Sequence, residues 1–172
     1  FKEPDVVTLP LYDEPFVVLL PKGHKLTKHR ALTNDMLLED NLLMLGPGHC
    51  FRDQVLAACP DILNMVALPA IDKPVTDNEP KQKLISEGSS LETIRHMVAS
   101  GLGISVLPMS AVMNGYYDES LLEVRPFAAP VPYRSVALAW RVTFPRPKAI
   151  DILATAAKKC SVLADKVKPD DS

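Results

Sequence analysis

Two of the three cysteines in this sequence stand close together. Cys50 follows the turn Gly46-Pro47-Gly48, and Cys59 comes nine residues later. A thiolate is the form of cysteine that peroxide attacks, and the resulting sulfenic acid can condense with a second thiol to give a disulfide. The first turn of a helix favours a thiolate, because its free N–H groups carry positive partial charge. A helix that begins after the glycine turn would therefore make Cys50 reactive, with His49 and Arg52 adding positive charge nearby.

The residues between the two cysteines predict such a helix, which Pro60 would end. At about 1.5 Å rise per residue, the two Cα atoms would lie roughly 13–14 Å apart, and nine steps of about 100° place the side chains on opposite sides. A disulfide requires Cα atoms within about 7 Å. An intact helix and a Cys50–Cys59 disulfide would therefore exclude each other, so forming the bond would unwind most of this segment and create a redox switch.

Short apolar runs alternate with helical patterns along the rest of the chain. We expect strands at Val6–Leu9 and Phe16–Leu20, each ending at a proline, and at Leu42–Leu45, Ile104–Leu107, Leu121–Val124 and Arg134–Val142. Helices are predicted from Thr33 to Leu38, from a capping box formed by Ser89 and Glu92 to Ser100, and from Pro147 to Lys166. Between Pro60 and Gly88 the proline-rich chain predicts irregular structure, with one strand near Met65–Leu68. This alternation predicts an α/β fold with mostly parallel sheets.

Composition narrows the classes of protein. The 172 residues are 47% hydrophobic, enough for one compact domain or two small lobes. The net charge is −2, and no run of Lys or Arg suggests a surface that binds DNA. No apolar stretch reaches the roughly 18 residues that span a bilayer. An odd number of cysteines suits a reducing cytosol, so we expect a cytoplasmic protein, and we expect Cys160 to be a packing residue. The chain starts at Phe1 and enters an apolar run at once, so we expect a piece of a longer protein.

Two segments resemble a known family. Gly-His-Cys-Phe-Arg-Asp-Gln at 48–54, followed by Cys59, resembles the redox motif of the OxyR branch of LysR-type transcriptional regulators. The segment 90–108, with its Gly-x-Gly-x-x-x-Leu-Pro ending, is similar to LysR effector domains in general, as are residues 10–15 and 23–26. The resemblance covers nearly the whole chain. The segment between Cys59 and Ser89 departs from it, being longer than in the best-known members.

The resemblance implies a fold and a domain organisation. We expect a regulatory domain of two Rossmann-like lobes, similar to periplasmic binding proteins. Residues 1–12 and 135–172 would form part of one lobe, and residues 13–134 would form the other lobe, which carries the cysteines. A winged helix-turn-helix DNA-binding domain would precede this chain.

The resemblance also implies roles for individual residues. Cys50 would be the peroxidatic cysteine and Cys59 the resolving cysteine. The thiolate would be surrounded by His49, Arg52, Asp53 and Arg134. Hydrogen peroxide, DNA bound through the absent domain, a second or further copy of the chain, and cellular thiol reductants would be the partners. The protein would be a regulator of the oxidative-stress response rather than an enzyme, and no cofactor or metal is expected.

Three other hypotheses remain open on the sequence. A LysR regulator could bind a small organic effector between its lobes, with the capped helix at Ser89–Glu92 offering N–H groups to an anion. A thiol peroxidase or disulfide oxidoreductase is disfavoured by the lack of a Cys-x-x-Cys pair. A metal site built from His24, His49, Cys50 and Cys59 is disfavoured by their spacing, which is unlike that of zinc ligands. His24, His29 and His96 are expected to be turn or surface residues.

Overall fold

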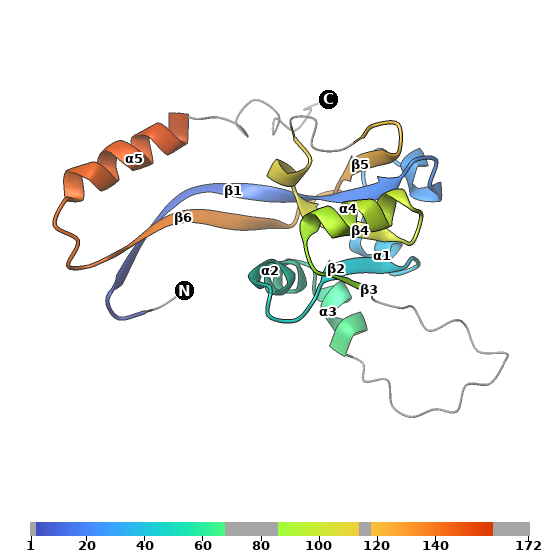
Figure 1. The fold of residues 1–172 in the computed structure, drawn as a ribbon, viewed down its shortest axis with the longest axis horizontal. Helices are drawn as coiled ribbons and strands as arrows, with labels where there is room; N and C mark the ends of the chain where they lie inside the picture. Colours follow the sequence, from blue (N-terminus) through green and yellow to red (C-terminus); the bar gives the residue numbers. More distant parts are fainter. Residues whose placement is uncertain (1–2, 68–85, 114–117, 160–172) are drawn as a thin grey trace. The chain divides into compact units, whose positions relative to one another are not determined.

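The computed structural model describes residues 3–67, 86–113 and 118–159 (Figure 1). The chain divides into two compact units, Phe1–Glu14 with Tyr133–Ser172 (unit 1) and Pro15–Pro132 (unit 2). Both cysteines of the expected switch belong to unit 2. That these units correspond to the two lobes, with the boundaries expected above, stays a prediction.

Unit 2 is built on a mixed sheet with the strand order β3-β2-β4-β1-β5. Its strands are the part of β1 (Val6–Pro21) from Pro15 onward, β2 (Leu42–Leu45), β3 (Ser86–Gly88), β4 (Ile104–Pro108) and β5 (Leu122–Pro126). β2 is parallel to β3 and β4, whereas β1 is antiparallel to β4 and β5. The α/β class is confirmed, but the expectation of a mostly parallel sheet is wrong. Apolar runs show that a strand is buried and say nothing of its direction, which the connections decide.

Helices cover both faces of this sheet. They are η1 (Lys25–Lys28), α1 (Asn34–Leu37), α2 (Cys50–Ala58), α3 (Pro60–Ala67), α4 (Leu91–Ala99) and η2 (Met109–Ala111). Side chains of β1 alternate between two apolar clusters, with Phe16 and Val18 in the cluster that includes Val55 of α2, and Val17 in the cluster that includes Ile94 of α4. Burial on both faces explains why residues 16–20 of β1 and the whole of β2 are continuous apolar runs rather than alternating ones.

The segment after Cys59 differs from its prediction. Residues Pro60–Ala67 form helix α3, so the strand expected near Met65–Leu68 is wrong for the described residues 65–67, and Leu68 lies outside them. Proline suits the first position of a helix, where its missing N–H has no intrahelical acceptor to lose. The same residue that ends α2 therefore begins α3.

Unit 1 contains the first part of β1, β6 (Tyr133–Arg141) and α5 (Pro147–Lys159). β1 runs through Pro10 without a break, so the strand end predicted there is wrong. β4 and β5 pair with β1 from Phe16 onward, and β6 lies beside its earlier part (Figure 1). Among the described strands, β6 is the one that pairs with this earlier part of β1. The other edge of β1 therefore has no strand-pairing hydrogen bonds to described residues here, and a strand tolerates proline at such an edge. α5 begins at Pro147 as predicted, and Cys160 lies outside the described residues.

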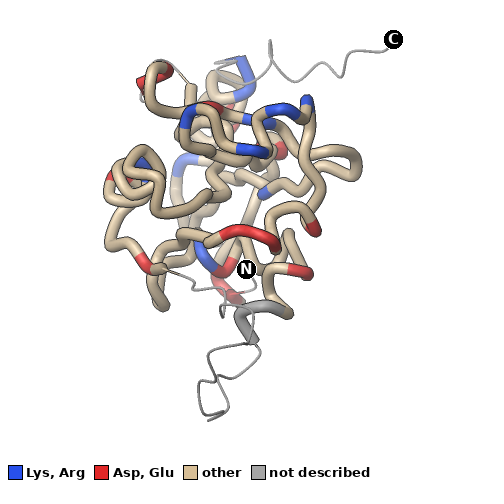
Figure 2. Tube along the Cα trace, turned by 90° about the vertical axis from the view of Figure 1, so that its right-hand side faces the viewer, with Lys and Arg blue, Asp and Glu red and all other residues tan. Residues whose placement is uncertain are grey.

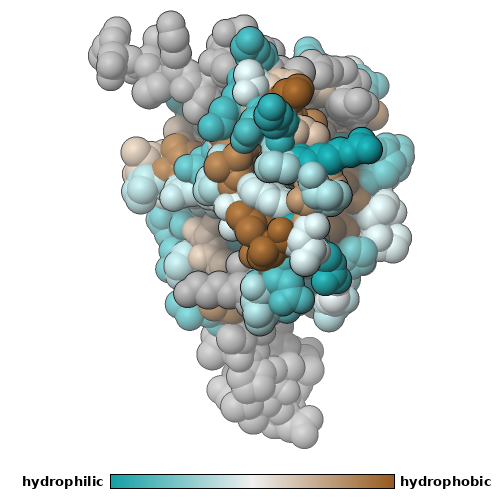
Figure 3. Space-filling view, turned by 90° about the vertical axis from the view of Figure 1, so that its left-hand side faces the viewer, coloured by the Kyte–Doolittle hydropathy of each residue, from teal (hydrophilic) through white to brown (hydrophobic). Residues whose placement is uncertain are grey.

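The surface of the described residues carries acidic, basic and apolar side chains. Both signs of charge occur along the trace (Figure 2). The view from the side of α5 shows apolar patches among hydrophilic residues (Figure 3), and unit 1 exposes Val142, Phe144, Ile152 and Leu153. Among the described helices, none combines the length and apolarity needed to cross a membrane. The large apolar core of the described chain lies in unit 2.

Candidate functional site

Cys50 is the first residue of α2 and is exposed to solvent. The helix starts there because Gly48 has φ of +90°, a backbone conformation that glycine adopts without steric cost, and His49 follows as an extended N-cap residue. Cys50 therefore opens the first turn of the helix, at the position that the sequence predicted. The helix itself is confirmed and ends at Ala58.

Cys59 is the C-cap residue of the same helix and is fully buried. Its backbone N–H donates to the Val55 carbonyl at 2.9 Å, and its side chain belongs to the apolar cluster that includes Ile62. Burial, with a smaller effect of the Asp61 charge, raises the pKa of the Cys59 thiol to about 11. At neutral pH Cys59 is therefore a protonated thiol that solvent cannot reach. Both cysteines are free, one at each end of α2.

The raised pKa of Cys59 predicts a loss of stability in alkaline solution. The folded chain holds the thiol proton up to about pH 11, whereas an unfolded chain releases it near the ordinary pKa of 9.0. The free energy of unfolding should therefore fall as pH rises from about 9 to 11, by about 2 kcal/mol from this thiol alone. Urea unfolding of the reduced chain and of Cys59→Ala across this range measures it. A pH dependence that is equal in the two proteins would contradict the prediction.

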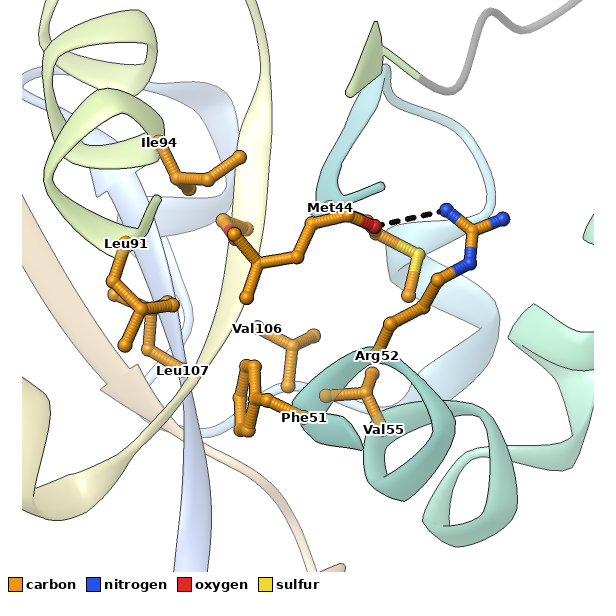
Figure 4. Close-up of a pocket in the computed structure, with 10 residues that line it drawn as sticks. Met44, Phe51, Arg52, Val55, Leu91, Ile94, Val106 and Leu107 are labelled. Atoms are coloured by element: carbon orange, nitrogen blue, oxygen red, sulfur yellow. Dashed lines mark hydrogen bonds between the residues drawn. The ribbon is translucent and has the colours of Figure 1, made fainter. Parts of the chain in front are cut away.

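The side chain of Arg52 contacts β2 and β3. Its Nη1 donates to the Leu45 carbonyl at 2.9 Å (Figure 4). The same nitrogen donates to Glu87 Oε1, also at 2.9 Å. Cys50 and Arg52 are two residues apart, about 200° around a helix, and residues at this spacing do not face each other. Closeness in sequence suggested a place for Arg52 beside the thiolate. That role stays a prediction, whereas the contacts that the structure gives Arg52 are with β2 and β3.

A small apolar pocket lies behind α2. It is enclosed by side chains of β2, α2, α4 and β4, namely Met44, Leu45, Phe51, Arg52, Val55, Leu91, Ile94, Ser105, Val106 and Leu107 (Figure 4). Phe51 packs edge-on against Phe16, with ring centroids 5.8 Å apart, and contacts both apolar clusters. These contacts hold the first turn of α2 against the sheet, so they would oppose any unwinding of the helix.

His49 and Asp53 are exposed residues at the start of α2. The His49 side chain makes no capping hydrogen bond, so it is not held by the helix backbone as a simple capping residue would be. Asp53, three residues after Cys50, lies on the same side of the helix. Their roles around the thiolate stay predictions.

Arg134 forms a close ion pair that the sequence did not reveal. Its Nε and Nη2 lie 2.7 and 2.6 Å from Glu14 Oε2, and Glu14 is 1% exposed. A neighbouring hydrogen bond joins the Ser135 hydroxyl to Asp13. These pairs join β1 and β6 within unit 1, and the relation of Arg134 to Cys50 stays a prediction. The sequence signal for Glu14 was a charged residue two positions before the buried apolar run that starts at Phe16.

The cap of α4 is shifted by one residue from its prediction. Ser90, not Ser89, is the N-cap residue, and its hydroxyl accepts a hydrogen bond from the Thr93 N–H at 3.1 Å. Glu92 instead pairs with Arg95 and His96 on the helix surface, so there is no capping box. Two adjacent serines made both registers possible.

Within residues 3–67, 86–113 and 118–159, no group of three or more His, Cys, Asp or Glu could hold a metal ion.

Comparisons with known proteins agree on one family. The model of the LysR substrate binding domain matches residues 1–63 and 70–160. A probable hydrogen peroxide-inducible genes activator of Streptomyces viridosporus is 35% identical over 156 residues, which are 91% of this chain and 45% of that protein. The DNA-binding transcriptional dual regulator OxyR of Escherichia coli K12 is 28% identical over 88% of this chain and 44% of its own length. The chain thus spans about half the length of the curated relatives it matches.

Solved structures give the same result at higher identity. The reduced form of the OxyR regulatory domain from Pseudomonas aeruginosa is 51% identical with a TM-score of 0.73, covering 93% of this chain and 69% of that one. The reduced form of OxyR from N. meningitidis is 42% identical with a TM-score of 0.76, covering 92% and 68%. The chain therefore belongs to the LysR substrate-binding domain family, in the branch of the OxyR regulatory domains.

Proposed function

We propose that this chain is the peroxide-sensing regulatory part of a DNA-binding transcriptional activator of the oxidative-stress response. One observation carries the proposal. An exposed cysteine at the first position of α2 and a buried cysteine at its C-cap are held at opposite ends of one nine-residue helix. The names of the relatives, hydrogen peroxide-inducible genes activators, support peroxide as the signal.

The first step is the oxidation of Cys50. The thiolate sulfur attacks one oxygen of hydrogen peroxide, the O–O bond breaks, and hydroxide leaves and takes up a proton to form water. Cys50 becomes a sulfenic acid, having lost two electrons to the peroxide. The exposure of Cys50 and the free N–H groups of the first turn of α2 favour this step.

The second step requires α2 to open. Buried and protonated, Cys59 cannot attack while the helix is intact. Once α2 unwinds, the Cys59 sulfur loses its proton and attacks the Cys50 sulfur, the S–OH bond breaks, and water leaves. The refolded segment then changes the arrangement of subunits and the DNA contacts of a domain outside this chain. Cellular thiol reductants in the cytoplasm return two electrons and restore the helix. The output of the cycle is a change in DNA contacts, as suits relatives that are gene activators, so we class the protein as a sensor rather than an enzyme.

Thiol counting tests this function. The reduced chain is treated with one equivalent of hydrogen peroxide, alkylated, digested and analysed by mass spectrometry. We expect the loss of two thiols and a linked peptide pair joining Cys50 and Cys59. Cys59→Ser should stop at a Cys50 sulfenic acid that dimedone traps, and Cys50→Ser should keep all its thiols. Three unreacted thiols in the unmodified chain would overturn the proposal. If the full-length Cys50→Ser protein still responds to its signal, the domain binds an organic effector instead.

A further inference from the structure

One guanidinium group fastens the redox helix to two strands. Arg52 Nη1 bonds to the carbonyl of Leu45, the last residue of β2, and to the carboxylate of Glu87, the middle residue of β3. The Arg52 side chain is 11% exposed and that of Glu87 45%. A guanidinium that bonds a backbone oxygen and a carboxylate from one nitrogen, largely shielded from water, has a more fixed position than an ordinary surface ion pair.

The carboxylate that Arg52 contacts belongs to Glu87 of β3, and not to α2. β3 pairs in parallel with β2, which places Glu87 opposite Met44 and Gly88 opposite Leu45. The Gly46 N–H donates to the Gly88 carbonyl at 3.3 Å, so the turn before α2 is tied to β3 as well. Glu87 is therefore held by the sheet and can keep its position while the helix opens.

We propose that Glu87 is a positioning residue of the redox switch, which acts through Arg52 to stabilise the helical, reduced form of α2. The inference rests on the proposed function and goes beyond it, because it gives Arg52 a tethering role rather than a place beside the thiolate. Joining Cys50 to Cys59 unwinds the helix that carries Arg52, and this separates the guanidinium from Leu45 and Glu87. The tether therefore opposes disulfide formation and helps reductants to reverse it.

Weakening the tether should favour the disulfide. We expect Glu87→Gln to raise the equilibrium constant for disulfide formation about fivefold, which makes the reduction potential about 20 mV more negative for a two-electron couple. Arg52→Gln should shift it in the same direction. The double variant should behave as Arg52→Gln alone, since Glu87 has no guanidinium to hold once Arg52 is gone.

Redox titration of the whole chain measures the effect. The chain is equilibrated in dithiothreitol buffers of stepped potential, quenched with alkylating agent, and the Cys50–Cys59 disulfide is quantified by mass spectrometry. Glu39→Gln is the matched control, because it removes one negative charge from a largely exposed pair with Lys25 in the same unit. It should titrate as the unmodified chain does. A Glu87→Gln potential equal to that of the control, or additive effects in the double variant, would refute the tether.

A second readout separates the tether from a role at the thiolate. In a Cys59→Ser, Cys160→Ser background, the rate of Cys50 alkylation by iodoacetamide is followed against pH. The tether predicts that the midpoint is the same whether or not Arg52→Gln is added to this background, whereas a guanidinium beside the sulfur predicts a higher midpoint in Arg52→Gln. A raised midpoint would therefore contradict the inference. If the unmodified chain forms no disulfide at any potential, the proposed function fails; if it forms one and Glu87→Gln changes nothing, this inference alone fails.

Discussion

Phe51→Ala is expected to speed the closure of the Cys50–Cys59 disulfide about 30-fold. The Phe51 ring packs on Phe16 and contacts both apolar clusters of unit 2. Removing a half-buried phenylalanine side chain should cost about 2 kcal/mol of packing, which corresponds to about a 30-fold change in an equilibrium. In the proposed mechanism the sulfenic acid cannot meet the buried Cys59 until α2 opens, so a more populated open state should raise the closure rate by the same factor.

Quenched-flow alkylation measures this rate as the decay of the dimedone-trappable Cys50 sulfenic acid into disulfide. Leu122→Ala is the control, because Leu122 is a buried residue of β5 that is remote in sequence from α2. Both variants should lose stability against urea, but only Phe51→Ala should close faster. Equal acceleration in both would mean that global unfolding limits closure, and no acceleration in Phe51→Ala would mean that opening of α2 is not limiting.

The switch helix could be predicted from the sequence because its signals are local. A glycine turn before Cys50 and a proline after Cys59 bound a segment of helical composition, and the structure places α2 between them. Burial of Cys59 could not be read from the same signals. It depends on how α2 and α3 pack on the sheet, and the sequence predicted no helix after Pro60.

The side-chain contacts of the site were the least predictable feature. The sequence suggested a place for Arg52 beside the sulfur, which stays a prediction, but it gave no sign of the contact between Arg52 and Glu87. Glu87 lies 35 residues later in the chain, and Glu14 lies 120 residues before Arg134. Such partners are brought together by strand pairing, and a single sequence contains no pattern that joins them.

Arg134→Ala is expected to destabilise the chain by about 3 kcal/mol, because it leaves the Glu14 carboxylate buried without its guanidinium partner. Arg141→Ala is the matched control on the same strand. Its pair with Asp5 is long, at 3.8 Å, and the two side chains are 76% and 72% exposed. Loss of that pair should therefore change the free energy of unfolding by less than about 0.5 kcal/mol. Urea unfolding of the two variants gives the comparison, and equal losses would contradict it.

Adding Glu14→Gln to Arg134→Ala should recover part of the loss, because a neutral amide costs less to bury than a carboxylate. If the double variant is no more stable than Arg134→Ala, the cost comes from lost packing rather than from the unpaired charge.

The comparison also bears on the role that the resemblance assigns to Arg134 near the reactive site. A guanidinium held by a buried carboxylate keeps one position, so any role of Arg134 in the reaction, as the resemblance implies it, would depend on Glu14. Glu14→Gln alone should then slow the reaction of Cys50 with peroxide in the full-length protein. An unchanged rate in that variant would separate the structural role of the ion pair from any role at the thiolate.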